Sequence, residues 1–144
     1  VMEWVEEATS RGAKVLAGGV RTGTSVEPTV LTDVPPDARA WSEEVFGPVI
    51  AVSVVDGVDE AFAAVNDSEY GLQAGVFTRD IRTAFRARSE LDVGGVIVGD
   101  VPSYRADQMP YGGVKKSGVG REGIRSAMAD LTEERVMVLT GLDL

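Results

Sequence analysis

Residues 49–55 read Val-Ile-Ala-Val-Ser-Val-Val, and two shorter apolar runs follow them at 74–77 and 96–98. Short, nearly continuous runs rich in β-branched residues are typical of strands that are buried on both faces. Each gap between these runs contains apolar residues at helical spacing, and each is long enough for a crossover between parallel strands, which needs about a dozen residues. This stretch predicts an α/β fold with a largely parallel sheet and flanking helices.

The pattern extends in both directions along the chain. Apolar residues recur at the spacing of one helix face in four segments, and they predict helices near 1–12, 58–65, 81–91 and 124–131. Short apolar runs predict further strands at 15–17, 30–31 and 136–139. The sequence contains no internal repeat, and we expect one domain.

The composition excludes several classes of function. With 14 Lys and Arg against 23 Asp and Glu, the 144 residues carry a formal net charge of −9, which disfavours binding to nucleic acid and to anionic membranes. The sequence contains no Cys and no His, which excludes disulfides, Cys/His zinc sites and thiol- or imidazole-based catalysis by these residues. Neither a membrane-spanning run nor a signal peptide is recognisable, so we expect a cytoplasmic protein.

The segment 99–120 is rich in glycine, lacks a regular period and is long for a loop inside a compact domain. Because it follows a predicted parallel strand, it leaves the carboxyl edge of the sheet, where open α/β sheets bind their ligands. Tyr104, Arg105, Asp107 and Tyr111 are the polar and aromatic groups of this loop that are able to face a cavity. Arg105 either pairs with Asp107 at the surface or holds an anionic group of a ligand with its planar guanidinium.

Glu43 and Glu44 are adjacent carboxylates directly before the strand at 49–55. On spacing alone such a pair is typical of a solvated helix turn. The continuation through Gly47 and Pro48 favours a rigid turn instead. A rigid turn of this kind would position one carboxylate and one aromatic ring, that of Phe46.

Residues 118–123 match the pattern G-x-G-x-x-G and precede a predicted helix. A dinucleotide-binding fingerprint must follow directly on a strand, and these residues follow a glycine-rich loop. We therefore interpret them as a loop that turns into the helix.

Three blocks of the sequence resemble a known family. Residues 43–49 are similar to the E-E-x-F-G-P-V segment of the NAD(P)-dependent aldehyde dehydrogenases, and Asn66 with residues 70–77 is similar to their N-x-x-x-Y-G-L-x-A-G-V-F block. Residues 109–123 resemble M-P-[FY]-G-G-x-K-x-S-G-x-G-R-E-G, the longest of the three. The blocks occur in the family's order, and the resemblance is to its C-terminal part only.

The resemblance implies roles for particular residues. Glu44 matches the glutamate that hydrogen-bonds the nicotinamide-ribose hydroxyls, and Phe46 matches the aromatic residue that packs beside the nicotinamide. Tyr104, Arg105 and Tyr111 fall in the loop that lines the family's substrate tunnel. The implied cofactor is NAD or NADP. An Arg105 that faces the tunnel would favour a short aldehyde with a distal carboxylate, phosphonate or similar anion.

The resemblance also implies what this chain lacks. The family's cysteine nucleophile, glutamate base and asparagine oxyanion donor lie in earlier segments, so we expect this chain by itself to be inactive. Residues 1–131 correspond to part of the catalytic domain, and residues 132–144 correspond to a terminal strand that associates subunits into a homodimer or homotetramer. The alternative is a free-standing non-catalytic module of the same fold that acts through subunit or partner association.

Overall fold

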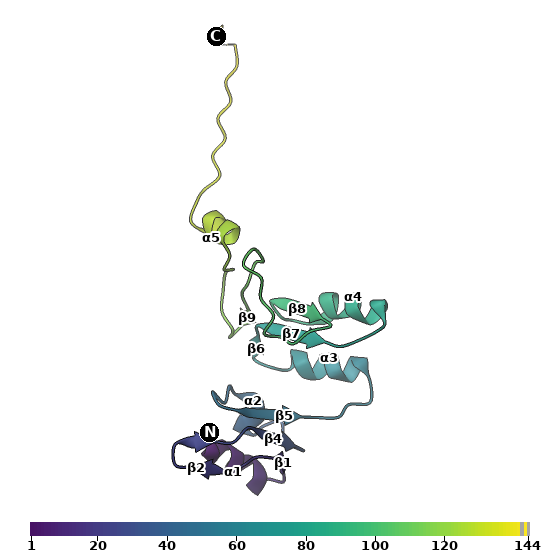
Figure 1. Cartoon of the computed structure of the whole chain (residues 1–144). Coiled ribbons are helices and arrows are strands. Elements are labelled where there is room, and N and C mark those ends of the chain that lie inside the picture. Colours follow the sequence, from purple (N-terminus) through teal and green to yellow (C-terminus); the bar gives the residue numbers. More distant parts are fainter. Residues whose placement is uncertain (142, 144) are drawn as a thin grey trace. The chain divides into compact units, whose positions relative to one another are not determined.

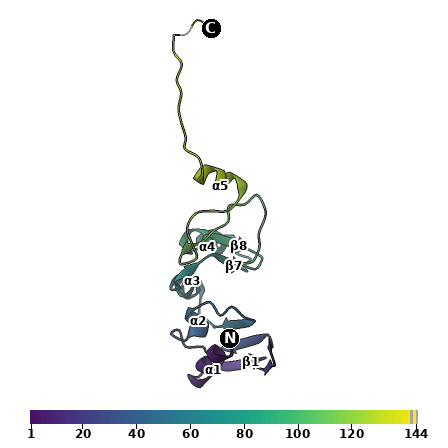
Figure 2. The ribbon, with the colours of Figure 1, turned by 90° about the vertical axis from the view of Figure 1, so that its left-hand side faces the viewer.

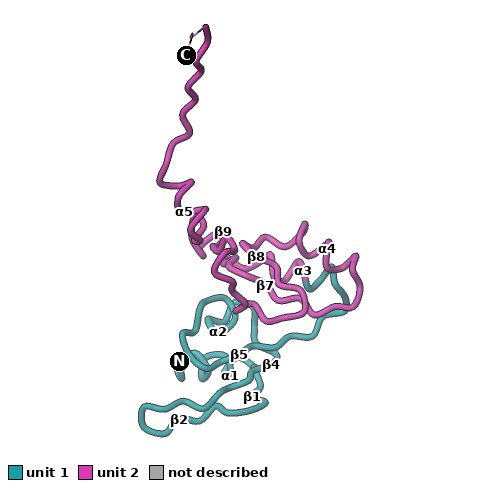
Figure 3. The backbone as a smooth tube through the Cα atoms, turned by 45° about the horizontal axis from the view of Figure 1, so that its top comes forward, with its two compact units in different colours: residues 1–61 teal, residues 62–144 magenta. Residues whose placement is uncertain are grey.

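The computed structural model describes residues 1–141 and 143. The chain forms two compact units, Val1–Ala61 and Phe62–Leu144, which Figure 3 distinguishes by colour. The boundary falls inside one helix, α3 (Val58–Asn66). Our expectation of one domain therefore differs from the observed grouping of contacts into two units.

The first unit is a small mixed sheet covered by helix α1 (Figure 1). Its central strand β4 pairs antiparallel with β1 and parallel with β5, and β2 and β3 form a separate hairpin. The elements are α1 (Met2–Ser10), β1 (Lys14–Ala17), β2 (Arg21–Thr22), β3 (Ser25–Val26), β4 (Thr29–Thr32), α2 (Arg39–Ser42) and β5 (Val49–Val52).

The core of the first unit lies between α1 and strand β4. Val5 and Ala8 of the helix are buried with Leu31 of the strand, as the helical spacing near residues 1–12 predicts. Thr29 is buried beside them. Its hydroxyl donates to the Glu27 carbonyl at 2.8 Å and accepts from the Gly19 N–H at 2.9 Å, so its polar atom is satisfied inside the core.

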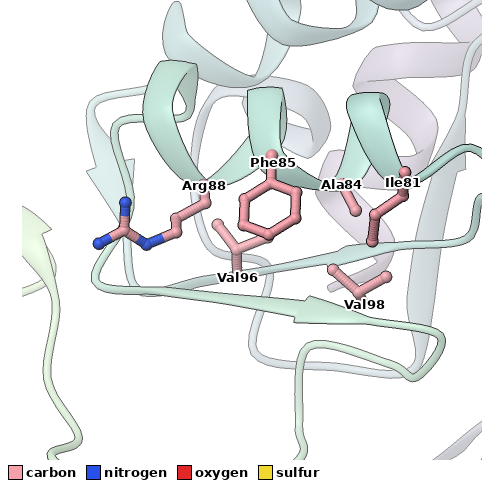
Figure 4. A pocket seen from close by; sticks show the side chains of 6 residues that line it. All are labelled: Ile81, Ala84, Phe85, Arg88, Val96 and Val98. Carbon is pink, nitrogen blue, oxygen red and sulfur yellow. The ribbon is translucent and has the colours of Figure 1, made fainter.

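The second unit contains the predicted β–α–β crossover. Strands β7 and β8 pair in parallel, from Gln73 opposite Gly95 to Val76 opposite Val98, and helix α4 connects them. Figure 4 shows the α4 side chains facing strand β8. The remaining elements of this unit are the rest of α3, then β6 (Tyr70–Gly71), β7 (Gln73–Val76), α4 (Ile81–Glu90), β8 (Gly95–Val98), β9 (Val114–Lys115) and α5 (Ile124–Asp130).

The α/β class and all four predicted helices are confirmed. The pairing is more mixed than expected, because β1 with β4 and β6 with β9 are antiparallel. Burial on both faces is wrong for β1, which is exposed along its whole length, and for β5, which alternates between half-buried and exposed residues. In the first unit the buried side chains of α1 cluster with Leu31 of the central strand β4, and no buried side chain of β1 or β5 joins them.

The segment after α5 is extended and exposed through residue 141, and Figures 1 and 2 show it leading away from that helix. Residues 136–139 form no strand there, because within residues 1–141 and 143 no neighbouring strand pairs with them. Their role in subunit association stays a prediction.

None of the helices in the described part of the chain is long and apolar enough to cross a membrane. No group of three or more His, Cys, Asp or Glu side chains there is arranged to hold a metal ion.

Candidate functional site

The turn that carries Glu44 and Phe46 lies between α2 and β5 in the first unit. Helix α2 has a single turn and is too short to be stable alone, so tertiary contacts must fix it. The Arg39 guanidinium forms an ion pair with Glu7 of α1 and lies 5.2 Å from the Trp4 ring centre. The hydrogen bond from Arg39 also holds the pKa of Glu7 below its usual range. The carboxylate pair therefore follows a helix that is anchored to α1.

The far end of this turn is anchored as well. The Pro48 carbonyl accepts a hydrogen bond from the Thr29 N–H at 2.8 Å, and the Val49 N–H donates to the Gly47 carbonyl at 2.8 Å. A Cβ atom at Gly47 would lie 2.5 Å from Val1 Cγ2, so a larger residue there would require the Val1 side chain to move. The rigid turn that Gly47 and Pro48 predict is present.

Phe46 has a backbone φ of +48°, in the left-handed region that bulky residues rarely adopt, and its side chain is 84% exposed. A strained residue with an exposed ring gains nothing from core packing, which is a pattern found at binding sites. Glu44 is exposed, and its carboxylate has no hydrogen-bond or ion-pair partner among the described residues. Glu43 is exposed too, so exposure alone does not distinguish the two carboxylates.

The loop that contains Tyr104 and Arg105 rests on strand β7 of the second unit. The Gln73 amide Nε2 donates to the Pro102 carbonyl at 2.5 Å and to the Tyr104 carbonyl at 3.0 Å. A Cβ atom at Gly75 would lie 2.7 Å from the Asp100 carbonyl oxygen, so the loop backbone approaches the strand as closely as glycine allows. We call residues 100–105 the strand-bound loop.

Gln73 carries a second feature at this position. Its Oε1 atom is buried and has no hydrogen-bond partner in the described part of the chain. A buried acceptor without a donor is uncommon in folded proteins. Gln73 is therefore held by its two loop contacts, and its carbonyl is free to accept from another group.

Arg105 lies in a cluster with Tyr111 and Glu122. Its Nη2 donates to Glu122 Oε2 at 2.7 Å, and the guanidinium carbon lies 4.5 Å from the centre of the Tyr111 ring. Tyr111 and Glu122 are joined through both of their backbone hydrogen bonds, at 2.6 and 3.1 Å. We call these three side chains the Arg105 cluster. The partner at the surface is thus Glu122, and the expected alternative of a pair with Asp107 is wrong.

A hollow of about 290 Å³ adjoins the Arg105 cluster. Tyr111, Arg121, Glu122 and Asp130 contribute its aromatic and charged lining. Arg121 donates through Nη1 to the carbonyls of Gly113 and Gly120, at 2.9 and 2.7 Å, so its role is to hold the glycine-rich loop. The hollow therefore has polar lining and shares Tyr111 and Glu122 with the Arg105 cluster, although Arg105 itself does not line it.

The glycine pattern at 118–123 is a loop that leads into α5, as interpreted from the sequence. The strand before it, β9, is short and pairs antiparallel with β6. A dinucleotide fingerprint requires a parallel strand at this place, so the arrangement does not fit one.

A second hollow of about 290 Å³ lies between α4 and β8 (Figure 4). Ile81, Ala84 and Phe85 of the helix face Val96 and Val98 of the strand, with Arg88 at one end. Its lining is almost entirely aliphatic and aromatic, so it offers packing surface and no acid–base chemistry.

Sequence reasoning missed Gln73 and Glu122 as members of the site. Both occur in blocks that resemble family motifs, which is the signal that could have singled them out. Their spatial neighbours are distant in sequence, at Tyr104 and Arg105. The structure brings Arg105 and Tyr111 together, with Tyr104 beside them in the strand-bound loop, whereas Glu44 and Phe46 belong to the other unit.

Fold and geometry define part of an α/β domain, and comparison with known proteins identifies its family. Residues 1–137 match the aldehyde dehydrogenase family. Over 139 residues the chain is 52% identical to 3-sulfolactaldehyde dehydrogenase of Priestia aryabhattai, covering 96% of this chain and 29% of the relative.

Two solved structures have the same fold. Aldehyde dehydrogenase 21 of Physcomitrella patens, in complex with the product succinate, matches with a TM-score of 0.92 and 47% identity, over 96% of this chain and 29% of that one. The glyceraldehyde-3-phosphate dehydrogenase GapN of Methanocaldococcus jannaschii, in complex with NADP, matches with a TM-score of 0.82 and 40% identity, over 88% and 27%. The chain belongs to the aldehyde dehydrogenase family and spans less than a third of the length of these relatives.

Proposed function

We propose that this chain is the C-terminal portion of an NAD(P)-dependent aldehyde dehydrogenase that oxidises a short aldehyde with a distal anionic group to the carboxylic acid. Because the sequence contains no cysteine, the nucleophile must come from outside these residues, and the chain alone is inactive. Its contribution is to hold the nicotinamide end of the cofactor and the distal end of the substrate.

The observation that carries the proposal is the state of the Arg105 guanidinium. It stacks on Tyr111, and Glu122 occupies its Nη2 donor, while Nη1 and Nε have no hydrogen-bond partner among residues 1–141 and 143. A preformed planar donor set of this kind suits a carboxylate, sulfonate or phosphate. The names of the three relatives support this, since they describe a sulfonated aldehyde, a dicarboxylic product and a phosphorylated aldehyde.

The chemistry of the turn before β5 fits the nicotinamide end of NAD or NADP. A bound nicotinamide cofactor accepts a hydride from the substrate. The exposed Glu44 carboxylate is able to accept two hydroxyl hydrogen bonds from a ribose, and the exposed Phe46 ring is able to pack against a nicotinamide. The role of these two residues is to fix the orientation of the ring.

A second function is favoured by the extended segment after α5. Val136, Met137, Val138 and Leu139 are all exposed, and no strand of the described chain pairs with them. An apolar run of this kind drives association. A non-catalytic module that acts through subunit or partner association would use the same segment.

The test of the enzymatic proposal compares 4-oxobutanoate with butanal, which have the same chain length and differ in the distal carboxylate. In the complete enzyme, Arg105→Ala should lower kcat/KM for 4-oxobutanoate by about tenfold to a hundredfold, because a charged hydrogen bond contributes about 1.5–3 kcal/mol, and should leave butanal unchanged. Arg79→Ala, at an exposed arginine outside the strand-bound loop, is the matched control. An unchanged preference for the anionic aldehyde in Arg105→Ala would contradict the proposal.

The cofactor arm uses the same assay with a different pair of variants. Glu44→Gln should raise KM for the nicotinamide cofactor and leave the preference between the two aldehydes unchanged. Glu43→Gln is the control, since it removes the neighbouring exposed carboxylate. Equal effects of the two substitutions would exclude a specific role for Glu44.

A further inference from the structure

We infer that Gln73 is a positioning residue that sets the preference for anionic aldehydes, because its side-chain amide holds the strand-bound loop and with it the backbone of Arg105. This inference rests on the proposed function, since it presupposes that Arg105 binds the distal anion. In the sequence block that resembles the family, position 73 is an unspecified one, so the resemblance assigns Gln73 no role.

The strand-bound loop lies across one face of strand β7. Gly75 and Gln73 are two residues apart in this strand, so both belong to the same face of the sheet. A Cβ atom at Gly75 would lie 2.7 Å from the Asp100 carbonyl oxygen, so the loop begins in close contact with the strand. Further along, Gln73 Nε2 donates to the Pro102 carbonyl at 2.5 Å. The glycine lets the loop approach, and the glutamine binds it.

The second hydrogen bond of Gln73 acts on the peptide group that leads into Arg105. Its acceptor is the Tyr104 carbonyl, at 3.0 Å from Nε2. This carbonyl and the Arg105 nitrogen belong to one planar peptide group, so holding the carbonyl fixes the direction of the chain at Arg105. The guanidinium at the other end of the side chain contacts Glu122 and the Tyr111 ring. Arg105 is therefore held at its backbone and at its guanidinium by different residues.

The neighbouring strand leaves room for the Gln73 side chain. Gln73 lies opposite Gly95 in the parallel register of β7 and β8. A Cβ atom at Gly95 would lie 2.8 Å from Gln73 Oε1 and 3.2 Å from its Cγ, so the glutamine occupies the space that a larger residue would fill. Oε1 is buried at this position, while Nε2 binds the loop. Gly95 is therefore part of the same positioning arrangement.

The experiment measures the ratio of kcat/KM for 4-oxobutanoate to kcat/KM for butanal in the complete enzyme. Gln73→Ala removes both loop hydrogen bonds and adds no charge. The ratio should fall about tenfold, because misplacing a group by about 1 Å costs up to about a hundredfold. The fall should come from a higher KM for 4-oxobutanoate, with kcat for both aldehydes unchanged, since Arg105 binds a part of the substrate that does not react. Gln108→Ala, at an exposed glutamine outside the strand-bound loop, is the matched control.

Two double variants show whether Gln73 acts through Arg105. In an enzyme that already carries Arg105→Ala, Gln73→Ala should not change the ratio further, because the group that it positions is gone. Gly95→Ala alone should lower the ratio, since the added methyl group displaces the Gln73 side chain. Added to Gln73→Ala, the same substitution should have no further effect. A purely structural role of Gln73 would instead lower kcat/KM for both aldehydes equally.

The outcomes separate the inference from the function on which it rests. If Arg105→Ala lowers the ratio and Gln73→Ala does not, positioning by Gln73 is wrong and the proposed function stands. A further fall of the ratio on adding Gln73→Ala to Arg105→Ala overturns the inference as well. If Arg105→Ala itself has no effect, the proposed function fails, and the inference fails with it. Should Gln73→Ala not fold, Gly95→Ala decides, and an unchanged ratio in that variant overturns the inference.

Discussion

Replacing Gly75 by alanine tests whether strand β7 sets the position of the strand-bound loop. The backbone of Gly75 is not in the left-handed region, so alanine is compatible with its φ and acts only through its added methyl group. That Cβ would lie 2.7 Å from the Asp100 carbonyl oxygen and 3.1 Å from the Pro102 nitrogen, both of which are backbone atoms.

The size of the effect follows from these distances. Ordinary van der Waals contact begins at 3.4 Å, so the 2.7 Å approach is 0.7 Å too short, and the loop backbone has to move by about that amount. Since misplacing a reacting group by about 1 Å costs about a hundredfold in rate, we expect kcat/KM for an anionic aldehyde to fall about tenfold or more. Overpacking of this kind also destabilises by about 1–3 kcal/mol.

The assay is steady-state kinetics of the complete enzyme with 4-oxobutanoate and butanal, together with hydrogen exchange of residues 100–105. Gly57→Ala is the matched control, because an added Cβ there meets no atom within 4 Å. We expect Gly75→Ala to lose activity selectively toward the anionic aldehyde and to exchange faster in the loop. Equal losses for both aldehydes, or an unaltered loop, would refute the reasoning.

Three further changes test the fold. Leu31→Ala removes a side chain that is 0% exposed and should lower the free energy of unfolding by about 2–5 kcal/mol. Leu16→Ala, at a side chain that is 63% exposed, is the control and should change this free energy little. Calorimetric unfolding of the two variants measures the difference. Asp80 caps α4, and the hydrogen bond that its carboxylate accepts from the Arg82 N–H holds the pKa of Asp80 below its usual range. The charged carboxylate therefore stabilises the folded state fully at a pH above the pKa that Asp80 has in the unfolded chain. This stabilisation is lost as the pH falls through the lower pKa that Asp80 has in the folded chain. Asp80→Asn should therefore melt below the unsubstituted protein at neutral pH, with a difference that vanishes in acid; a constant difference would contradict this. Removing residues 132–144 should reduce the oligomer mass of the complete enzyme in light scattering, and an unchanged mass would argue against an association strand.

The spacing of apolar residues was sufficient to predict the helices that run for two or more turns. Ile81, Ala84 and Phe85 share one face of α4, and this face packs on β8 as expected. The pairing of Tyr70 with Lys115 joins two strands of two residues each, and strands this short are not long enough to show an alternation of apolar and polar residues in the sequence. The antiparallel pairing of β1 with β4 likewise depends on the path of the hairpin between them.

In the candidate site, too, local features could be predicted from the sequence and contacts between distant residues could not. The rigid turn at Gly47 and Pro48 follows from residue types alone, because both restrict the backbone locally. The contact between Arg105 and Glu122 depends on a backbone bridge at Tyr111, and no spacing rule shows which carboxylate that bridge selects. The exposure of β1 was not predictable, since burial depends on what covers a strand and not on its own residues.

The left-handed backbone of Phe46 has a consequence for engineering. Glycine adopts a φ of +48° without the steric cost that a side chain brings, and the exposed ring contributes little burial energy. Phe46→Gly should therefore raise the melting temperature while it weakens cofactor binding. A directed-evolution campaign that selects only for heat resistance would tend to discard this ring, and sequence libraries at this position should be screened for turnover first.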